Sequence, residues 1–137
     1  MNDFRISLDD LCHGWATITF ENNEQEVIHT FSHITVDALS CLVYSAMAIM
    51  RNEPYHARFY LEPDDILYEA TPHEGKVDIL IGNKPFSCDV KRYARQILTM
   101  FAYYLSSHSI DEYVAQWHYD YPKNAIEQLR NQLKEHT

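Results

Sequence analysis

The spacing of apolar residues along this chain switches between two periods, and the order of the switches limits the folds open to it. Helical spacing occupies residues 39–50 and returns from residue 89 onward. Apolar and polar residues alternate in six other segments, as in half-buried β-strands: 3–8, 15–21, 25–32, 55–62, 66–71 and 77–81. Strands, a helix, more strands and then helices predict an α+β fold, not alternating βαβ units. We expect a mostly antiparallel sheet of about five to six strands packed against helices, with a helical C-terminal third.

Turn and capping residues predict where these elements begin and end. The short link Asn22-Asn23-Glu24 favours a hairpin between the second and third strands. Ser32 or Thr35 is expected to cap the first helix, with Asp37 in its first turn. The Asn83-Lys84-Pro85 run is expected to end the strands, and Asp89 to open the longest helix. Ser109 can cap the next helix, and Pro122 can start the last one.

The size and composition of the chain favour an ordinary globular protein. It has 137 residues, of which 46% are hydrophobic and 23% charged, so we expect a single domain over residues 1–137. Its sequence holds no apolar run long enough for a transmembrane helix, and its first residues do not read as a secretory signal. The three cysteines are odd in number and lack close pairs, which favours reduced thiols. We therefore expect a cytoplasmic protein.

The charge of the chain is strongly negative and unevenly distributed. The net charge is −9, with −6 in residues 1–50, −4 in residues 51–90 and +1 in residues 91–137. Nucleic-acid binding needs a basic surface, and an anionic membrane attracts one, so neither is expected as a partner. A partner attracted by this field would be basic. A solvated acidic surface that only aids solubility remains open.

Motifs for phosphate and metal binding are missing from the sequence. The chain has 3 glycines and neither of the glycine-rich phosphate loops. It has 8 histidines, but the best-spaced pair, His29 and His33, spans the end of an expected strand. Residues four apart in a strand lie about 13 Å apart, too far to share one zinc ion. We expect no metal and no cofactor.

One short segment holds the residue types of a nucleophilic site. Asp10, Cys12 and His13 lie together between two expected strands, and Gly14 permits a constrained turn beside them. A small cysteine-dependent hydrolase is therefore one alternative. The simpler interpretation is a loop that contains a cysteine without a catalytic role.

Acidic residues gather in the second group of expected strands, and tyrosines accompany them. Tyr60 and Tyr68 flank the acidic turn at Asp64-Asp65, and tyrosine is favoured at protein interfaces. We expect the tyrosines and carboxylates to form one partner-binding patch on an edge or face of the sheet, although simple coverage of an exposed face is about as consistent. The expected interface residues are Glu53, Tyr60, Glu62, Asp64, Asp65, Tyr68, Glu69, Glu74 and Asp78.

The order of elements and several short motifs resemble a known family. The motifs are Gly14-Trp15, Asp37-Ala38-Leu39, Glu62-Pro63, Tyr113 with Trp117, and Tyr121-Pro122. They resemble the small acidic immunity proteins of contact-dependent growth inhibition and related polymorphic-toxin systems of bacteria. The resemblance covers most of the chain. It implies a cytosolic, non-enzymatic protein that binds one toxin domain, often a nuclease, and covers its active site, and it supplies no catalytic residues.

Taken together, these observations predict an immunity protein that forms a heterodimer with a basic toxin domain. Its acidic, tyrosine-rich surface would cover the basic active site of the toxin. Two alternatives stay open: the hydrolase that uses Asp10, Cys12 and His13, and a non-catalytic domain that forms homo-oligomers through an aromatic face.

Overall fold

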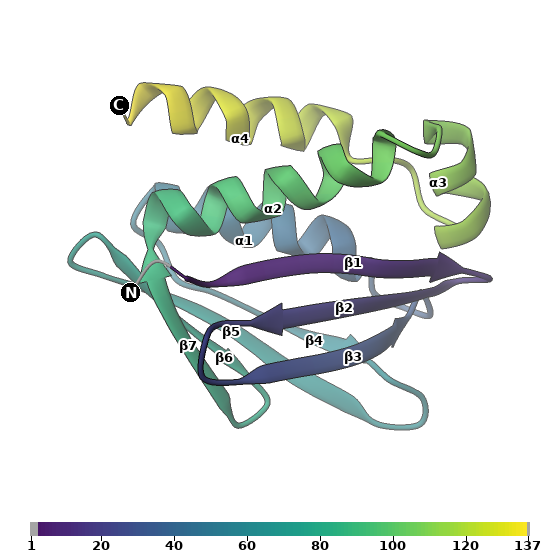
Figure 1. The fold of residues 1–137 in the computed structure, drawn as a ribbon, viewed down its shortest axis with the longest axis horizontal. Helices are drawn as coiled ribbons and strands as arrows, with labels where there is room; N and C mark the ends of the chain where they lie inside the picture. Colours follow the sequence, from purple (N-terminus) through teal and green to yellow (C-terminus); the bar gives the residue numbers. More distant parts are fainter. Residues whose placement is uncertain (1–2, 137) are drawn as a thin grey trace.

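The computed structural model describes residues 3–136, and over these residues the chain forms two antiparallel sheets and four helices (Figure 1). The first sheet has the order β1–β2–β3, from β1 (Arg5–Cys12), β2 (Trp15–Glu21) and β3 (Glu26–Ser32). The second has the order β4–β5–β6–β7, from β4 (Tyr55–Tyr60), β5 (Asp65–His73), β6 (Lys76–Ile81) and β7 (Lys84–Asp89). The helices are α1 (Ala38–Met50), α2 (Val90–Leu105), α3 (Ile110–Trp117) and α4 (Lys123–Glu135). The α+β class and the helical C-terminal third are confirmed, whereas the single sheet of five to six strands is wrong.

The strand that the sequence did not predict is β7, which contains Pro85. Gly82, with a φ of 62°, and Asn83 form a two-residue connection that folds β7 back on β6. Proline cannot donate to a sheet ladder, so it is confined to edge strands. Because β7 is the edge of its sheet, Pro85 is tolerated there, and the expectation that it ends the strands is wrong.

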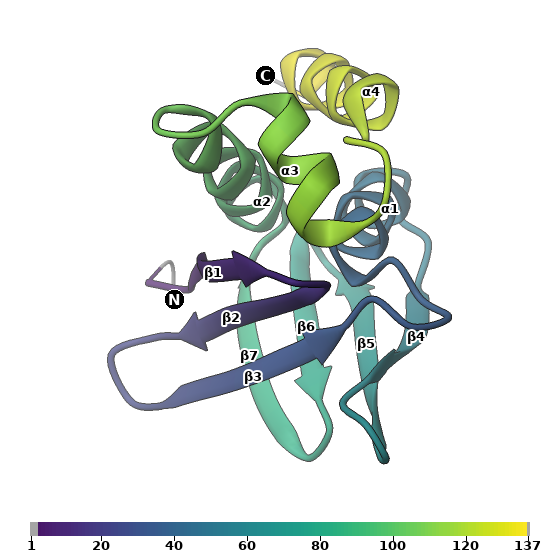
Figure 2. The same ribbon diagram turned by 90° about the vertical axis from the view of Figure 1, so that its right-hand side faces the viewer.

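The two sheets face each other, and the strands of one run across those of the other (Figure 2). Helix α1 lies between β3 and β4 in the chain, so these strands are not joined by a hairpin. Aromatic side chains join the sheets, with Phe20 and Tyr68 at 6.0 Å and Phe31 and Phe59 at 5.1 Å between ring centroids. The alternating apolar residues of both sheets thus fill one shared core.

The helices form a layer above the sheets (Figure 2). Helix α1 contacts β4 and β5, α2 contacts β1, β6 and β7, and α4 lies across α1 and α2. The cap of α1 is Asp37, whose carboxylate accepts the Ser40 N–H at 3.1 Å, so the expected caps Ser32 and Thr35 are wrong. Ser109 caps α3 as predicted, in a reciprocal capping box with Glu112.

Strand β1 extends four residues further than the sequence predicted. A register shift between Leu8 and Asp10 lets the strand continue to Cys12, and His13 and Gly14 then turn the chain into β2. Both turn residues have positive φ values, 52° and 81°, as in the two-residue hairpin turns that match strand twist. None of the helices within residues 3–136 is long and apolar enough to cross a membrane.

Candidate functional site

A groove of about 850 Å³ lies between the β2–β3 turn and the side of β5, β6 and β7 that faces away from the core. Four carboxylates line it, and no lysine, arginine or histidine is among the described residues of its lining. We call this feature the acidic groove and define it by Asp3, Glu24, Glu69 and Asp78.

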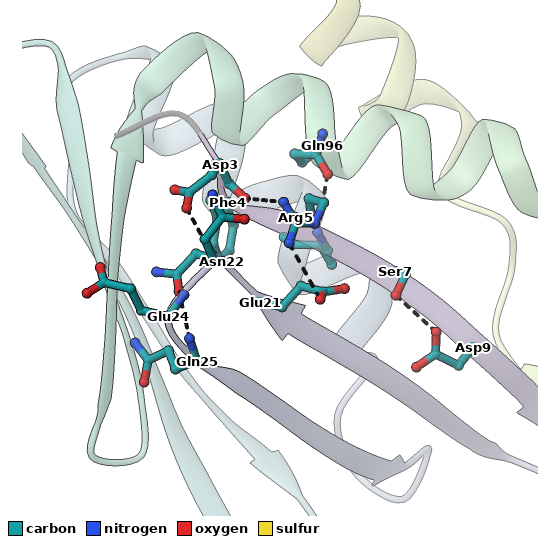
Figure 3. Close-up of polar contacts among 12 residues, drawn as sticks. Asp3, Phe4, Arg5, Ser7, Asp9, Glu21, Asn22, Glu24, Gln25 and Gln96 are labelled. Carbon is teal, nitrogen blue, oxygen red and sulfur yellow. Dashed lines mark hydrogen bonds and ion pairs between the residues drawn. The ribbon is translucent and has the colours of Figure 1, made fainter.

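The β2–β3 turn forms one wall of the acidic groove and is held by its own side chains (Figure 3). The side-chain oxygen of Asn22 accepts the N–H groups of Glu24 and Gln25, both at 2.9 Å. The Gln25 amide donates to the carbonyl oxygen of Pro85 on β7. These bonds fix the turn beside the second sheet, and they position Glu24 at the groove.

Asp3 adds a carboxylate whose ionised form is stabilised. It accepts the N–H of Asn23 at 2.9 Å, and this hydrogen bond lowers the pKa of the Asp3 carboxyl. The neighbouring Arg5 donates to the Asp3 carbonyl oxygen at 2.9 Å and pairs with Glu21 at 3.6 Å (Figure 3). The charge of Arg5 also lowers the pKa of the Asp3 carboxyl, although Arg5 itself does not line the groove.

The opposite wall carries Glu69 on β5 and Asp78 on β6, two residues of the predicted interface. Asp78 lies opposite Thr71 in the strand register, which makes Glu69 its diagonal neighbour. Diagonal positions lie about 7–8 Å apart, within reach of one long basic side chain. Two of the predicted interface residues therefore lie close together, and their role in partner binding stays a prediction.

A second group of predicted residues lies at the β4–β5 turn. Asp64 and Asp65 are exposed there, and Tyr60 pairs with Asp65 in the strand register. Asp65 forms an ion pair with Arg58 at 2.8 Å, and Glu62 accepts a hydrogen bond from Ser32. Two of the three carboxylates of this turn are thus already engaged within the chain.

Glu53 and Glu74 lie apart from both groups. Glu53 follows α1 and pairs with Arg51 at 3.2 Å, and Glu74 lies in the β5–β6 turn beside His73 at 4.0 Å. The β5–β6 turn is at the opposite end of β5 from the β4–β5 turn. The predicted acidic residues therefore lie at separate places and do not form one patch.

Tyr68 is the clearest error in the predicted interface. Its side chain is 0% exposed, and its hydroxyl group lies 2.5 Å from that of Tyr93. Ile66, Tyr68 and Ala70 share the inner side of β5, whereas Glu69 shares the outer side with Thr71. The same alternation in the sequence could have placed Tyr68 in the core.

The residues of the alternative hydrolase lie at the β1–β2 hairpin. Asp10 and Cys12 belong to β1, so the expectation of a loop is wrong, and His13 is in the turn. The His13 N–H donates to the side chain of Gln116 on α3 at 3.0 Å. Cys12 is half-buried. Asp10 lines a small cavity of about 240 Å³, and neither Cys12 nor His13 is among the described residues of that lining.

Two groove residues, Asp3 and Glu24, were missed by sequence reasoning. The sequence pattern places Glu24 only in a turn and Asp3 only in the first strand. The one signal for them is the charge of −6 in residues 1–50. That charge does not indicate which residues reach the groove, because this depends on the contact between the β2–β3 turn and β7.

Within residues 3–136, no group of three or more His, Cys, Asp or Glu side chains is arranged to hold a metal ion. Comparison with protein-family models, curated proteins and solved structures finds no match to this chain.

Proposed function

We propose that this protein is a non-catalytic binding protein of the immunity type, which neutralises a basic toxin domain of bacterial origin in the cytosol. The observation that carries the proposal is the acidic groove, where four carboxylates meet without a basic residue in the described lining. The role as an immunity protein rests in addition on the resemblance described above.

The electrostatics of the groove suit a basic protein surface. A net charge of −9 steers a basic partner toward the molecule and raises the association rate. Inside the complex, lysine, arginine or histidine side chains of the partner would pair with Glu69, Asp78, Asp3 and Glu24. Close charge pairs of this kind couple by about 1.5–7 kcal/mol in a tight complex. If these side chains belong to the active site of a toxin, pairing them in this way would prevent the substrate from reaching that active site.

The motifs behind the resemblance belong to the scaffold of this molecule. Gly14 turns β1 into β2, Asp37 caps α1, and the Trp117 indole donates to Asp37 at 2.7 Å. These residues stabilise the fold, so the resemblance that they carry is one of scaffold. It supports the class of protein proposed and does not identify the toxin.

The test of this function is a tagged pull-down from the native cell at low and moderate salt. We expect one stoichiometric, basic protein that inhibits growth when it is expressed alone and is neutralised by co-expression of this chain. Absence of such a partner at both salt concentrations would contradict the proposal.

Charge reversal at two places separates the acidic groove from the β4–β5 turn as the binding surface. The double variant Glu69→Lys with Asp78→Lys should slow association and weaken binding strongly, because it places two cations in the groove. The double variant Asp64→Lys with Asp65→Lys makes the same change of charge at the turn. Glu127→Lys with Glu135→Lys, both exposed on α4, is the control for net charge. Equal effects of all three variants would show that the groove is not the binding surface.

The hydrolase alternative is tested by thiol alkylation. A catalytic Cys12 would carry a thiolate that reacts rapidly with iodoacetamide near neutral pH. We expect a Cys12→Ser variant to retain partner binding. Fast alkylation together with loss of a hydrolytic activity in Cys12→Ser would favour the hydrolase.

A further inference from the structure

A second cavity, of about 710 Å³, has the opposite charge to the acidic groove. It lies where the start of α2, the end of α1, the β5–β6 turn and the end of α4 approach one another. Four of its lining residues are lysine, arginine or histidine, namely Lys91, Arg92, Arg95 and His136, and one lining residue, Asp89, is acidic. We call this feature the basic cavity.

The position of these bases is unfavourable for the helix that carries them. The first turn of α2 holds Lys91 and Arg92 and no acidic residue. Cations near the N-terminus of a helix oppose its dipole, so this arrangement works against the stability of α2. Asp89, the N-cap residue, forms no side-chain cap and instead lies 3.4 Å from Lys76. The negative charge of Asp89 at the helix N-terminus offsets part of this effect, and two cations in the first turn remain a local exception of the kind expected at functional sites.

The basic side chains of the basic cavity form few hydrogen bonds or ion pairs among the described residues. Arg92 donates to the carbonyl oxygen of Phe4 at 3.0 Å, which fixes its side chain between α2 and β1. Within residues 3–136, Lys91 and Arg95 form no ion pair at 4.0 Å or less. The chain has only 11 lysines and arginines against 20 acidic residues, so bases placed together without ion-pair partners are a distinct feature.

The rest of the lining suits a ligand larger than a simple ion. Ile49, Met50 and Val90 give the cavity an apolar side, and Asn52 adds an amide. Gly75 leaves space at the β5–β6 turn, since a Cβ atom there would meet nothing within 4 Å. A cavity with cations on one side and apolar contacts on the other matches an organic phosphate.

We propose that the basic cavity binds a small molecule that carries a phosphate group. The guanidinium groups of Arg92 and Arg95 present paired donors that match phosphate oxygens, and Lys91 adds a third charge. The apolar side contacts the organic part of the ligand. This site is separate from the acidic groove and does not rest on the proposed function.

The test is a titration followed by amide NMR spectra of the full chain, at about 0.15 M ionic strength, where charges separated by more than about 8 Å are screened. The probes are inorganic pyrophosphate, which tests for binding of the phosphate group alone, and ribose 5-phosphate, which also tests for contacts to the organic part of the ligand. We expect saturable shifts of the Gly75 and Lys91 amides with at least one probe, and no saturable shift with sodium acetate at equal ionic strength.

Matched variants test whether the basic cavity is the site of binding. Arg95→Gln should weaken binding by about tenfold, the loss expected for one charge-assisted hydrogen bond. Arg130→Gln, which removes an exposed charge on α4 outside the cavity lining, should leave the affinity within about twofold, as expected for a distant screened charge. Thermal unfolding of both variants without probe shows that each one is folded. Absence of saturation with both probes, or equal weakening by the two variants, would overturn the proposal.

Discussion

The indole nitrogen of Trp117 donates to the carboxylate of Asp37 at 2.7 Å, and this bond joins α3 to the N-cap residue of α1. The same carboxylate accepts the Ser40 N–H at 3.1 Å and the Ser40 hydroxyl at 2.6 Å. Trp117 is 0% exposed, so its N–H has no access to water. One side chain therefore caps a helix and satisfies a buried donor from a segment 80 residues away.

Replacing Asp37 should destabilise the protein through both roles. Asp37→Ala removes the cap, worth about 1 kcal/mol, and leaves the buried Trp117 donor unsatisfied, which costs about 1–3 kcal/mol more. Asp37→Asn keeps an acceptor oxygen and should lose less. Urea unfolding measures both changes, and Asp120→Ala, at an exposed position, is the control. A loss for Asp37→Ala no larger than that for Asp120→Ala would show that the bond contributes nothing.

Two buried tyrosines should respond oppositely to removal of the hydroxyl group. The Tyr93 hydroxyl lies 2.6 Å from Ser45 Oγ and 2.5 Å from the Tyr68 hydroxyl. Tyr93→Phe should therefore lower the free energy of unfolding by about 1–3 kcal/mol, because it leaves buried polar atoms without a partner. Tyr113 is also buried, but its hydroxyl oxygen has no hydrogen-bond partner among the described residues.

For this reason Tyr113→Phe should leave the free energy of unfolding unchanged or raise it by up to about 1 kcal/mol. Chemical denaturation of the two variants side by side checks the contrast. Similar losses for both would mean that the Tyr93 hydrogen bonds are not what stabilises that position.

The sequence predicted the elements of this fold more reliably than their assembly. Six of the strands and the C-terminal helices follow from local periodicity, which depends only on neighbouring residues. The division into two sheets depends on how the segment around α1 separates β3 from β4, and that is a property of packing. Strand β7 was not predicted because it contains Pro85. Proline is compatible with a strand only at a sheet edge, and the sequence does not show that β7 is an edge strand.

The candidate site was predictable only where its residues share one local pattern. Glu69 and Asp78 lie on adjacent strands of a meander, so their proximity follows from consecutive alternating segments. Asp3 and Glu24 reach the same groove through a long-range contact, the Gln25 bond to Pro85. Sequence spacing carries no signal for a contact of that kind.

Two glycines with nearly equal backbone angles separate strain from steric overlap. Gly14 and Gly75 have φ values of 81° and 79°, so alanine is strained at either position, by about 1–2 kcal/mol. A Cβ atom at Gly75 would meet nothing within 4 Å, whereas one at Gly14 would overlap the His33 ring. That ring is held by a 3.0 Å contact to the Gly14 carbonyl oxygen and by stacking on His118 at 4.6 Å.

Gly14→Ala should therefore cost about 1–3 kcal/mol more than Gly75→Ala, the range expected for an overpacked site. Urea unfolding of both variants measures the difference. The double variant Gly14→Ala with His33→Ala should recover part of the loss, since it removes the overlapping ring. Equal costs for the two single variants would show that the His33 ring yields freely.

The imidazole of His29 should make stability depend on pH below neutrality. His29 lies on the inner side of β3 between Val27 and Phe31, and its ring contacts the Phe31 ring at 5.7 Å. Burial lowers the pKa of His29 from its usual value of 6.5, so the unfolded chain takes up a proton at a higher pH than the folded chain. The stability that this group contributes is therefore complete above the unfolded pKa and is lost as the pH falls from there toward the folded pKa. Urea unfolding at several pH values between about 5 and 8, the window in which histidine titrates, should show a smaller loss of stability for His29→Gln than for the unmodified protein. Identical profiles for His29→Gln and the unmodified protein would contradict the assignment to His29.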